Sequence, residues 1–324
     1  MSEQPESELE LRRKIAAEAS GAEEAPSIFV RAGQFFLVPL GIVTACVAVY
    51  LFFTYLVSDA RKPQDLVQEM QTGGQASRKF AAHQLVAEIR RQVSTGKPDR
   101  SLVDPLLTVL RSPVSQGDPE LQQVIILSLG LLGDSKAAGP ILEELRRTND
   151  PESMAACLEA LGALRAPEAA EPLIKLLDHP STVVRKYAAF NLAAVAAPEK
   201  RGEAPATPSV PAAVPHLRRK LEDEREEVRW NAALGLAVFL QDPSGKKVLL
   251  QMLDRAYLER VIRNNPKESE VSWLVAHTMT QTCQAVANLR DPSFGDTLGA
   301  VAKNDPDSNV RAAARMAIDM ISKK

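Results

Sequence analysis

The sequence predicts an all-α protein, an α-solenoid of about seven helical pairs preceded by a single transmembrane helix. Three observations support this fold class. Apolar residues recur at helical spacing throughout residues 65–324. A short alanine-rich pattern returns at successive steps of 32 and 31 residues, as in a repeat array. Ahead of the repeats, 23 consecutive residues carry no charge.

The repeat pattern is clearest in the segment Pro180–Pro198, which predicts one amphipathic helix that begins after a Pro/Ser/Thr turn and ends before a proline. The residues of its packing face fall at i, i+3, i+4, i+7, i+8 and i+11. They are Val184, Tyr187, Ala188, Asn191, Leu192 and Val195. Arg78–Leu85 matches Arg185–Leu192 nearly class for class, and Arg229–Ala233 repeats the same pattern. We infer several copies of one helical module.

Composition narrows the function classes. The 324 residues are 45% hydrophobic and 25% charged, with a net charge of −2. A nucleic-acid partner usually requires a basic excess, so we expect no nucleic acid. Aromatic residues make up 5% of the chain, which favours closely packed helices over a sheet. The three cysteines show neither a disulfide framework nor metal spacing, which suits a reducing compartment.

Residues 1–34 predict a polar N-terminal tail in which seven acidic residues oppose four basic ones. Leu9, Leu11 and Ile15 flank the basic run Arg12–Lys14, so a short helix lying on a membrane surface is one interpretation. A frayed tail is the other, and the thin apolar face favours it.

Phe35–Val57 predicts a transmembrane helix of 23 residues. At 1.5 Å per residue, such a helix spans about 34 Å, enough for a hydrocarbon core of about 30 Å. A cleaved signal peptide would need a shorter apolar run after a basic start. We therefore expect a retained anchor. Arg61 and Lys62 follow it, whereas only Arg31 lies close before it, so the positive-inside rule places the C-terminal part in the cytoplasm.

Residues 58–64 predict a linker, and residues 65–324 predict the solenoid. Most pairs consist of two apolar stretches with a Gly- or Pro-containing turn between them. The expected pairs are 66–72 with 75–89, 102–110 with 121–132, 141–145 with 154–164, 173–177 with 183–195, 214–221 with 227–240, 248–253 with 271–289, and 294–302 with 310–321. Each pair is too small to bury its apolar face alone, so stacking supplies the core.

Two interruptions lengthen the later repeats. Residues 201–211 are rich in proline and alanine and predict a loop. The connection 254–272 is expanded, and insertions in solenoids often lie on the binding face. It carries Arg255, Arg260 and Arg263, which are candidate partner-binding residues.

Trp273, just after this connection, is a fourth candidate, because an exposed tryptophan commonly anchors a protein interface. Trp230 occupies a position next to the packing face, so we expect it to lie in the core or between repeats.

Two motifs recur at the turns and helix starts. Asp-Pro turns occur at Asp118, Asp150, Asp242, Asp291 and Asp305. Val-Arg helix starts occur at Val184, Val228 and Val310, and Ala-Ala-x-x-Leu-Gly-type sequences fill the helix interiors.

With these motifs, residues 65–324 resemble the HEAT-repeat family, a HEAT/armadillo-like fold, and in particular its short alanine-rich subclass first associated with phycobilisome lyases. The resemblance implies that the arginines at the helix starts and the turn aspartates form a ladder between neighbouring repeats. By this comparison the ladder residues are Arg185, Arg229 and Arg311.

No sequence motif indicates catalysis. His83, His179, His216 and His277 have no second ligand at metal spacing, and nucleophile-elbow, Walker A and dinucleotide-binding motifs are lacking. Because Phe190 stands at the equivalent position of another repeat, we expect His83 to be half-buried. No cofactor or metal site is predicted.

We therefore expect a non-enzymatic scaffold or adaptor that presents its repeat surface to a membrane-associated protein. The order of anchor, linker and repeats also resembles bacterial membrane-anchored HEAT proteins that accompany membrane complexes, which implies the bacterial inner membrane. Two alternatives stay open. One is an accessory subunit of a transporter or respiratory assembly. The other is a lyase-like or cofactor-chaperoning protein, which the phycobilisome-lyase resemblance implies.

Overall fold

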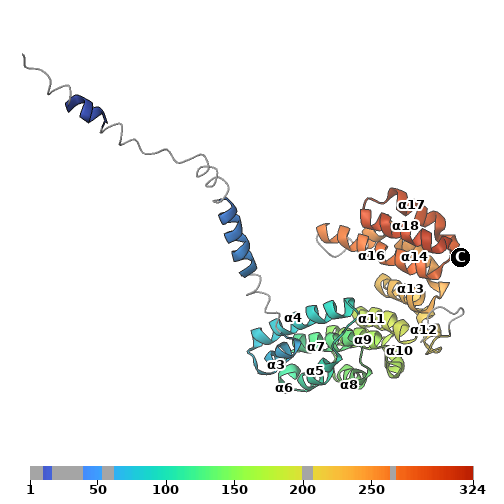
Figure 1. Ribbon diagram of the computed structural model, residues 1–324. Coiled ribbons are helices and arrows are strands. Elements are labelled where there is room, and N and C mark those ends of the chain that lie inside the picture. Colours follow the sequence, from blue (N-terminus) through green and yellow to red (C-terminus); the bar gives the residue numbers. More distant parts are fainter. Residues whose placement is uncertain (1–9, 17–38, 53–61, 199–206, 263–267, 324) are drawn as a thin grey trace, which may run out of the picture. The chain divides into compact units, whose positions relative to one another are not determined.

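The computed structural model describes residues 10–16, 39–52, 62–198, 207–262 and 268–323 (Figure 1). The chain divides into two compact units, Met1–Arg61 and Lys62–Lys324. In the first unit, residues 10–16 and 39–52 are helical and their side chains are exposed.

The predicted tail and anchor are described only in part. Residues 39–52 belong to the predicted span of residues 35–57, whose two ends lie outside the described residues, as does most of the predicted linker. Among the helices that the structure describes, none combines the length and the apolar character needed to cross a membrane.

The second unit consists of stacked antiparallel helix pairs, and its described residues contain no strand. An A helix precedes a B helix in each pair. The pairs are α3 (Pro63–Thr72) with α4 (Gln75–Ser94), α5 (Val103–Leu110) with α7 (Pro119–Leu132), α8 (Ala138–Arg147) with α9 (Pro151–Leu164), α10 (Ala170–Leu176) with α11 (Thr182–Val195), α12 (Ala213–Arg219) with α13 (Glu226–Leu240), α14 (Lys246–Met252) with α16 (Glu268–Leu289), and α17 (Gly295–Asn304) with α18 (Ser308–Ser322). The predicted helical solenoid is confirmed.

Shorter elements fill the turns. They are α6 (Pro113–Gln116), α15 (Arg255–Ile262) and the 3-10 turns η1 (Arg100–Leu102), η2 (Ser135–Ala137), η3 (Pro167–Ala169), η4 (Lys220–Glu222), η5 (Pro243–Gly245) and η6 (Pro292–Phe294). The expanded connection that we expected between α14 and α16 thus contains a helix of its own, α15.

The Asp-Pro turns serve two kinds of helix start. Asp118 and Asp150 cap B helices, and their carboxylates accept hydrogen bonds from the backbone N–H groups of Leu121 and Ser153 at 3.2 and 2.8 Å. Asp242 and Asp291 instead cap the 3-10 turns that lead into A helices. In all four cases proline follows directly, at a position where its missing N–H costs nothing.

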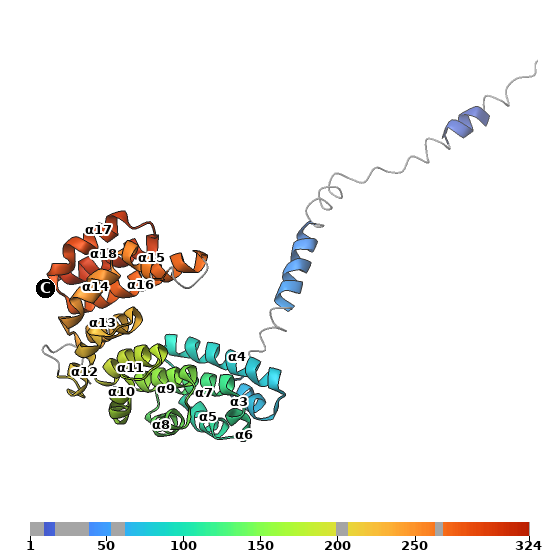
Figure 2. The same ribbon diagram turned by 180° about the vertical axis from the view of Figure 1, so that it is seen from behind.

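The B helices lie side by side along the inner edge of the array, and the A helices lie along its outer edge (Figures 1 and 2). Small residues let neighbouring B helices approach closely. A Cβ atom on Gly130 of α7 would lie 2.7 Å from the Cα of Ala160 on α9. A Cβ atom on Gly235 of α13 would lie 2.8 Å from the Cβ of Ala193 on α11. Steric fit at these positions therefore sets the spacing between repeats.

The hydrophobic interior is divided into two clusters. One extends from α3 to α12 and the other from α14 to α18, and α13 contributes to both. Ala232 and Leu236 of α13 belong to the first cluster, whereas Ala233 and Ala237 belong to the second. Two adjacent faces of one helix therefore join the two parts of the core.

Candidate functional site

The candidate binding surface is the inner face of the B helices. Each of these helices packs on its own A helix and beside neighbouring B helices, so one stripe of each is left facing the inside of the curve. On α9 this stripe holds Glu152, Glu159 and Ala163, which are exposed and spaced at helical intervals while most of the remaining helix is buried. The corresponding stripe of α7 holds Leu127 and Leu131, both half-buried.

Half-buried aromatic side chains lie next to these carboxylates. Phe190 of α11 and Phe239 of α13 form an edge-to-face pair with ring centroids 5.2 Å apart. Tyr187, one turn before Phe190, packs at the margin of the hydrophobic core. We call Glu152, Glu159, Tyr187, Phe190 and Phe239 the aromatic–acidic patch. It spans three consecutive B helices.

The charges of Glu152 and Glu159 act on the phenol of Tyr187, which shows that the acidic and aromatic side chains lie close together. Burial raises the pKa of the Tyr187 phenol, and the negative charges of Glu159 and Glu152 raise it further because they oppose a second anion. The ammonium group of Lys186 lies 5.3 Å from the centroid of the Tyr187 ring, a cation–π arrangement. The patch therefore already holds one basic side chain against an aromatic face.

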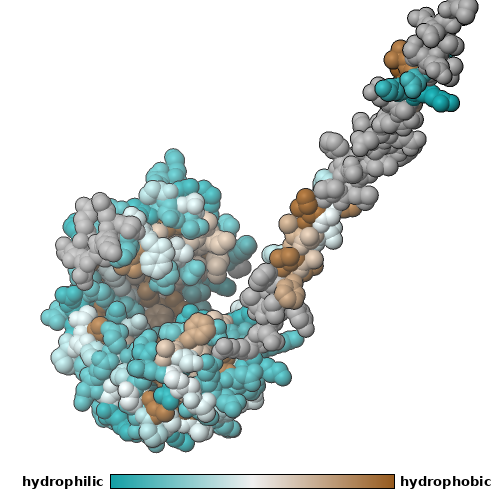
Figure 3. All heavy atoms as spheres, turned by 90° about the vertical axis from the view of Figure 1, so that its left-hand side faces the viewer, coloured by the Kyte–Doolittle hydropathy of each residue, from teal (hydrophilic) through white to brown (hydrophobic). Residues whose placement is uncertain are grey.

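Figure 3 shows a hollow between the part of the repeat unit with α16–α18 and the part with α4–α11, and hydrophobic side chains are visible inside it. Phe80 of α4 is 58% exposed and occupies the position of Tyr187 in its own repeat. Exposed aromatic side chains around a hollow are typical of protein-binding surfaces.

Arg185, the first predicted ladder residue, links two repeats. Its guanidinium donates two hydrogen bonds of 3.2 Å to the carboxylate of Asp223, which belongs to the next repeat. It also donates to the carbonyl oxygens of His179 and Pro180, both at 3.0 Å. The side chains of Arg185 and Asp223 are 8% and 5% exposed, so this ion pair is buried.

The other two predicted ladder residues bind their own turns. Arg229 donates to the carbonyl oxygen of Asp223 at 2.7 Å, and Arg311 donates to that of Asp305 at 2.7 Å. The expectation of a ladder contact at these two positions is wrong, since no described residue of a following repeat pairs with either guanidinium. In the repeat after α13, the expanded connection between α14 and α16 takes the place of the short turn, and α18 is the last described helix.

The three candidate arginines of the expanded connection do not share one site. Arg255 donates to both carboxylate oxygens of Asp305 at 2.9 and 2.8 Å, and this bond raises the pKa of its guanidinium. Arg255 thus supplies the inter-repeat ion pair that we expected elsewhere. Arg260 is exposed and lies 5.7 Å from the ring centroid of Tyr257. Arg263 lies outside the described residues.

Trp273 is 64% exposed and stacks on the ring of His277, with centroids 5.1 Å apart and an interplanar angle of 8°. A pocket of ≈ 470 Å³ lies beside it. Its lining residues are Ser272, Trp273, Ala276, His277, Thr280, Asp307 and Asn309. Neither Arg255 nor Arg260 lines this pocket. Trp230, in contrast, is 8% exposed and meets Tyr257 edge to face, in agreement with the expected packing role.

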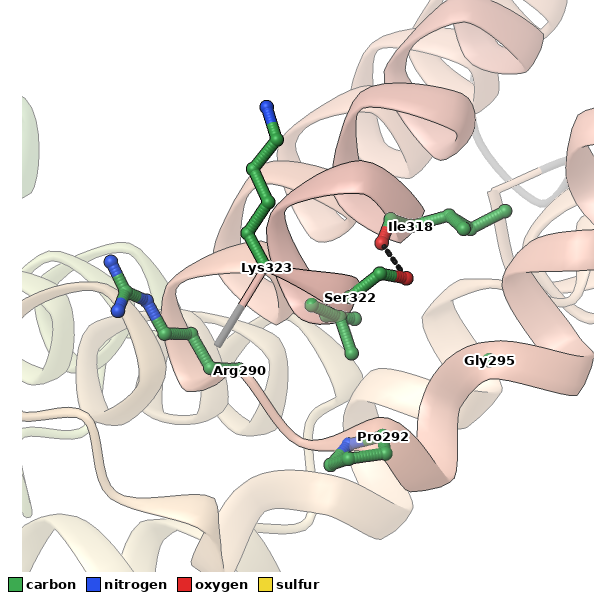
Figure 4. A pocket seen from close by; sticks show the side chains of 7 residues that line it. Arg290, Pro292, Gly295, Ile318, Ser322 and Lys323 are labelled. Atoms are coloured by element: carbon green, nitrogen blue, oxygen red, sulfur yellow. Dashed lines mark hydrogen bonds between the residues drawn. The ribbon is translucent and has the colours of Figure 1, made fainter.

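A second pocket, of ≈ 560 Å³, lies at the end of the array (Figure 4). Ile318 and Ser322 of α18 and Pro292 of η6 contribute to its wall, and Ser322 donates a hydrogen bond of 2.8 Å to the carbonyl oxygen of Ile318. Gly295, Arg290, Ile321 and Lys323 complete the lining. The two charged residues in this lining, Arg290 and Lys323, are both basic.

The remaining reactive groups form no catalytic cluster in the described residues. His83 is exposed, not half-buried as expected, and its Nε2 lies 3.6 Å from the likewise exposed carboxylate of Glu120 on α7. Burial raises the pKa of the Cys157 and Cys283 thiols to about 12. Such thiols are poor nucleophiles at neutral pH. No group of His, Cys, Asp or Glu among the described residues could hold a metal ion.

The aromatic–acidic patch is not among the sites that the sequence predicts. The spacing of Glu152 and Glu159, seven residues apart on one helix, was the available signal. Periodicity alone did not show that this face of α9 points away from every neighbouring helix.

Comparison with known proteins supports the fold. The family model for HEAT repeats matches residues 103–193 and 170–264, which together cover half of the chain. The curated proteins give no match. The complex of CpcE and CpcF of phycocyanin lyase from Nostoc sp. PCC7120 is 19% identical, with a TM-score of 0.50 over 80% of this chain and 94% of that chain. Human deoxyhypusine hydroxylase is 16% identical, with a TM-score of 0.33 over 84% of this chain and 99% of that chain.

Proposed function

Because this chain belongs to the HEAT-repeat family, we propose that it is a membrane-anchored scaffold or adaptor that binds a protein partner on the inner face of its B helices. The observations that carry this proposal are the hydrophobic side chains visible in the hollow and the half-buried or exposed aromatic side chains on the B helices. A water-soluble surface rarely keeps such side chains open unless something covers them. The outer A helices instead present mainly charged and polar side chains.

Site-specific photo-crosslinking tests which face binds. A photoreactive phenylalanine analogue replaces Phe80 or Tyr187 on the inner face, in the full chain expressed in its native cells. We expect both positions to give one adduct of the same partner, because an aromatic side chain there touches whatever fills the hollow. The matched control places the analogue at Arg146 or Lys247, which are exposed on A helices. Equal adduct yields from the outer positions would contradict the proposal.

Co-purification in mild detergent separates the alternatives. An accessory subunit stays with its complex at fixed stoichiometry when membranes are dissolved in mild detergent, whereas an adaptor dissociates as salt is added. Analogues at Trp273 and at Arg260 test the two other exposed candidate contact positions. The likeness to the lyase complex is a likeness of fold.

We further propose that Phe35–Val57 anchors the chain in the bacterial inner membrane, with the repeats in the cytoplasm. The uncharged run and the basic residues Arg61 and Lys62 after it support this orientation. Protease added to intact spheroplasts should leave the repeat unit uncut, and it should digest the unit once the membrane is opened. Digestion in intact spheroplasts would show that the repeats lie on the other side of the membrane. Recovery of the chain in the soluble fraction would contradict the proposed anchor.

A further inference from the structure

The geometry of helix α9 sets the distance between the two carboxylates of the aromatic–acidic patch. Glu152 and Glu159 are seven residues apart, close to two full helical turns, so both point from the same face. At 1.5 Å per residue their Cα atoms are about 10.5 Å apart along the axis. Glu152 lies in the first turn of the helix, and Glu159 lies in its middle. The two acids therefore form a short row parallel to α9.

Neither carboxylate has an ion-pair partner among the described residues. Glu120, the inner-face acid of the preceding B helix, is different, because Lys79 binds its carboxylate. Lys186 contributes one positive charge near the patch and lies over the Tyr187 ring. The inner face at α9 thus keeps a net negative charge beside an aromatic surface.

The apolar side of the patch lies next to this row. Phe190 and Phe239 are paired edge to face on α11 and α13, and Leu127 and Leu131 line α7 on the other side of α9. All four are half-buried, so each offers part of its surface to a partner. Apolar area of this kind drives association, and the adjacent charges select the partner.

We propose that the patch binds an amphipathic helix of the partner whose apolar face is flanked by Lys or Arg residues seven positions apart. This inference rests on the proposed function and specifies the class of partner. A helix that lies along α9 presents residues i and i+7 at about 10.5 Å, the spacing of Glu152 and Glu159. Its leucine or phenylalanine side chains then cover the aromatic pair and the leucines of α7.

Charge excludes the other obvious occupants. A second copy of this patch would bring like charges together, which disfavours a symmetric dimer through this face. A phosphate-bearing ligand would meet the same repulsion. The basic run Arg12–Lys14 of this chain precedes the predicted anchor, and the proposed topology therefore places it across the membrane from the repeats.

The test uses the full chain in nanodiscs of zwitterionic lipid and a fluorescein-labelled peptide of about 18 residues. The peptide has leucines on one helical face and two flanking lysines seven positions apart, and empty nanodiscs correct for its binding to lipid. Fluorescence anisotropy measures Kd. We expect the double variant E152K/E159K to weaken binding at least about tenfold, because two attractions become repulsions. A peptide with glutamates in place of the two lysines should prefer that variant, which also shows that the variant is folded.

The control variant E143K/E168K makes the same charge change at exposed positions of α8 and η3 and should leave Kd unchanged. Equal affinity of all variants for both peptides would overturn the inference. If the wild-type chain binds a peptide with its lysines four positions apart as tightly as the peptide with lysines seven apart, the proposed spacing is wrong. If Phe80 and Tyr187 still crosslink a partner while these charge effects are missing, the inference fails and the scaffold function stands. If no inner position crosslinks, the proposed function itself fails.

Discussion

Replacing Gly130 by valine is expected to lower the free energy of unfolding of the repeat unit by about 3 kcal/mol, because the new side chain overpacks a buried helix contact. Gly130 faces Ala160, and even a Cβ atom would lie 2.7 Å from the Cα of that residue. The neighbouring atom belongs to the backbone, so a rotamer change cannot relieve the clash. Helices α7 and α9 must move apart instead. Urea denaturation followed by circular dichroism measures the loss.

The matched control is Gly299→Ala in α17. A Cβ atom there meets nothing within 4 Å, and alanine favours a helix over glycine by about 1 kcal/mol. This variant should therefore be as stable as the wild type or slightly more stable. If Gly130→Val has wild-type stability, the close contact between α7 and α9 is wrong.

Substitution of Arg185 by alanine is expected to lower the free energy of unfolding by about 2 kcal/mol, because the buried carboxylate of Asp223 loses its guanidinium partner and keeps only the ion pair with Lys220. That carboxylate is 5% exposed. Arg311→Ala is the comparison, since Arg311 has the same Val-Arg context but donates to turn carbonyl oxygens only, and we expect it to cost about 1 kcal/mol. Equal losses from the two variants would contradict the structural role given to the inter-repeat pair.

The same pair predicts a pH dependence. Burial raises the pKa of Asp223, but hydrogen bonds from the Arg225 N–H, Arg185 and Lys220 outweigh it and lower the pKa. A lowered folded-state pKa contributes stability that is complete above the unfolded value of about 3.9 and is lost as pH falls through the folded value. The stability difference between wild type and Arg185→Ala should therefore shrink below about pH 4. Denaturation curves at pH 3 and pH 7 measure this change.

Helix positions were predictable because local signals determine them. The turn aspartates and prolines set where α7 and α9 begin, and apolar spacing indicated all of the main pairs. The helix α15 was missed because it is only eight residues long and lies inside a connection that we expected to be a loop, although its apolar residues have helical spacing. Short helices of this kind depend on the packing around them more than on their own sequence.

Pairing between repeats was not predictable from the motif. Arg185 and Arg229 occupy the same Val-Arg position, yet only Arg185 meets an aspartate of the following repeat. The insertion after α14 changes which residue faces the next turn, so Arg255 binds Asp305. A side chain's partner depends on the neighbouring module, and the sequence of its own module does not contain that information.

The candidate patch was hidden for a related reason. Tyr187 was assigned to the packing face of its helix, and it does lie at the margin of the core. Helical periodicity defines one apolar side, but in a stacked array a B helix has contacts on three sides. Only the positions of the neighbours show that Phe190 and Glu159 border the free fourth side.

The division of the hydrophobic interior at α13 has a consequence for how the chain folds during synthesis. Helices α3–α11 complete most of their own cluster before α14–α18 have left the ribosome, because the first cluster needs nothing from that later segment. The first half can then template the second through α13, one face of which is already docked. The emerging polypeptide thus never has to keep its whole apolar content unburied at once.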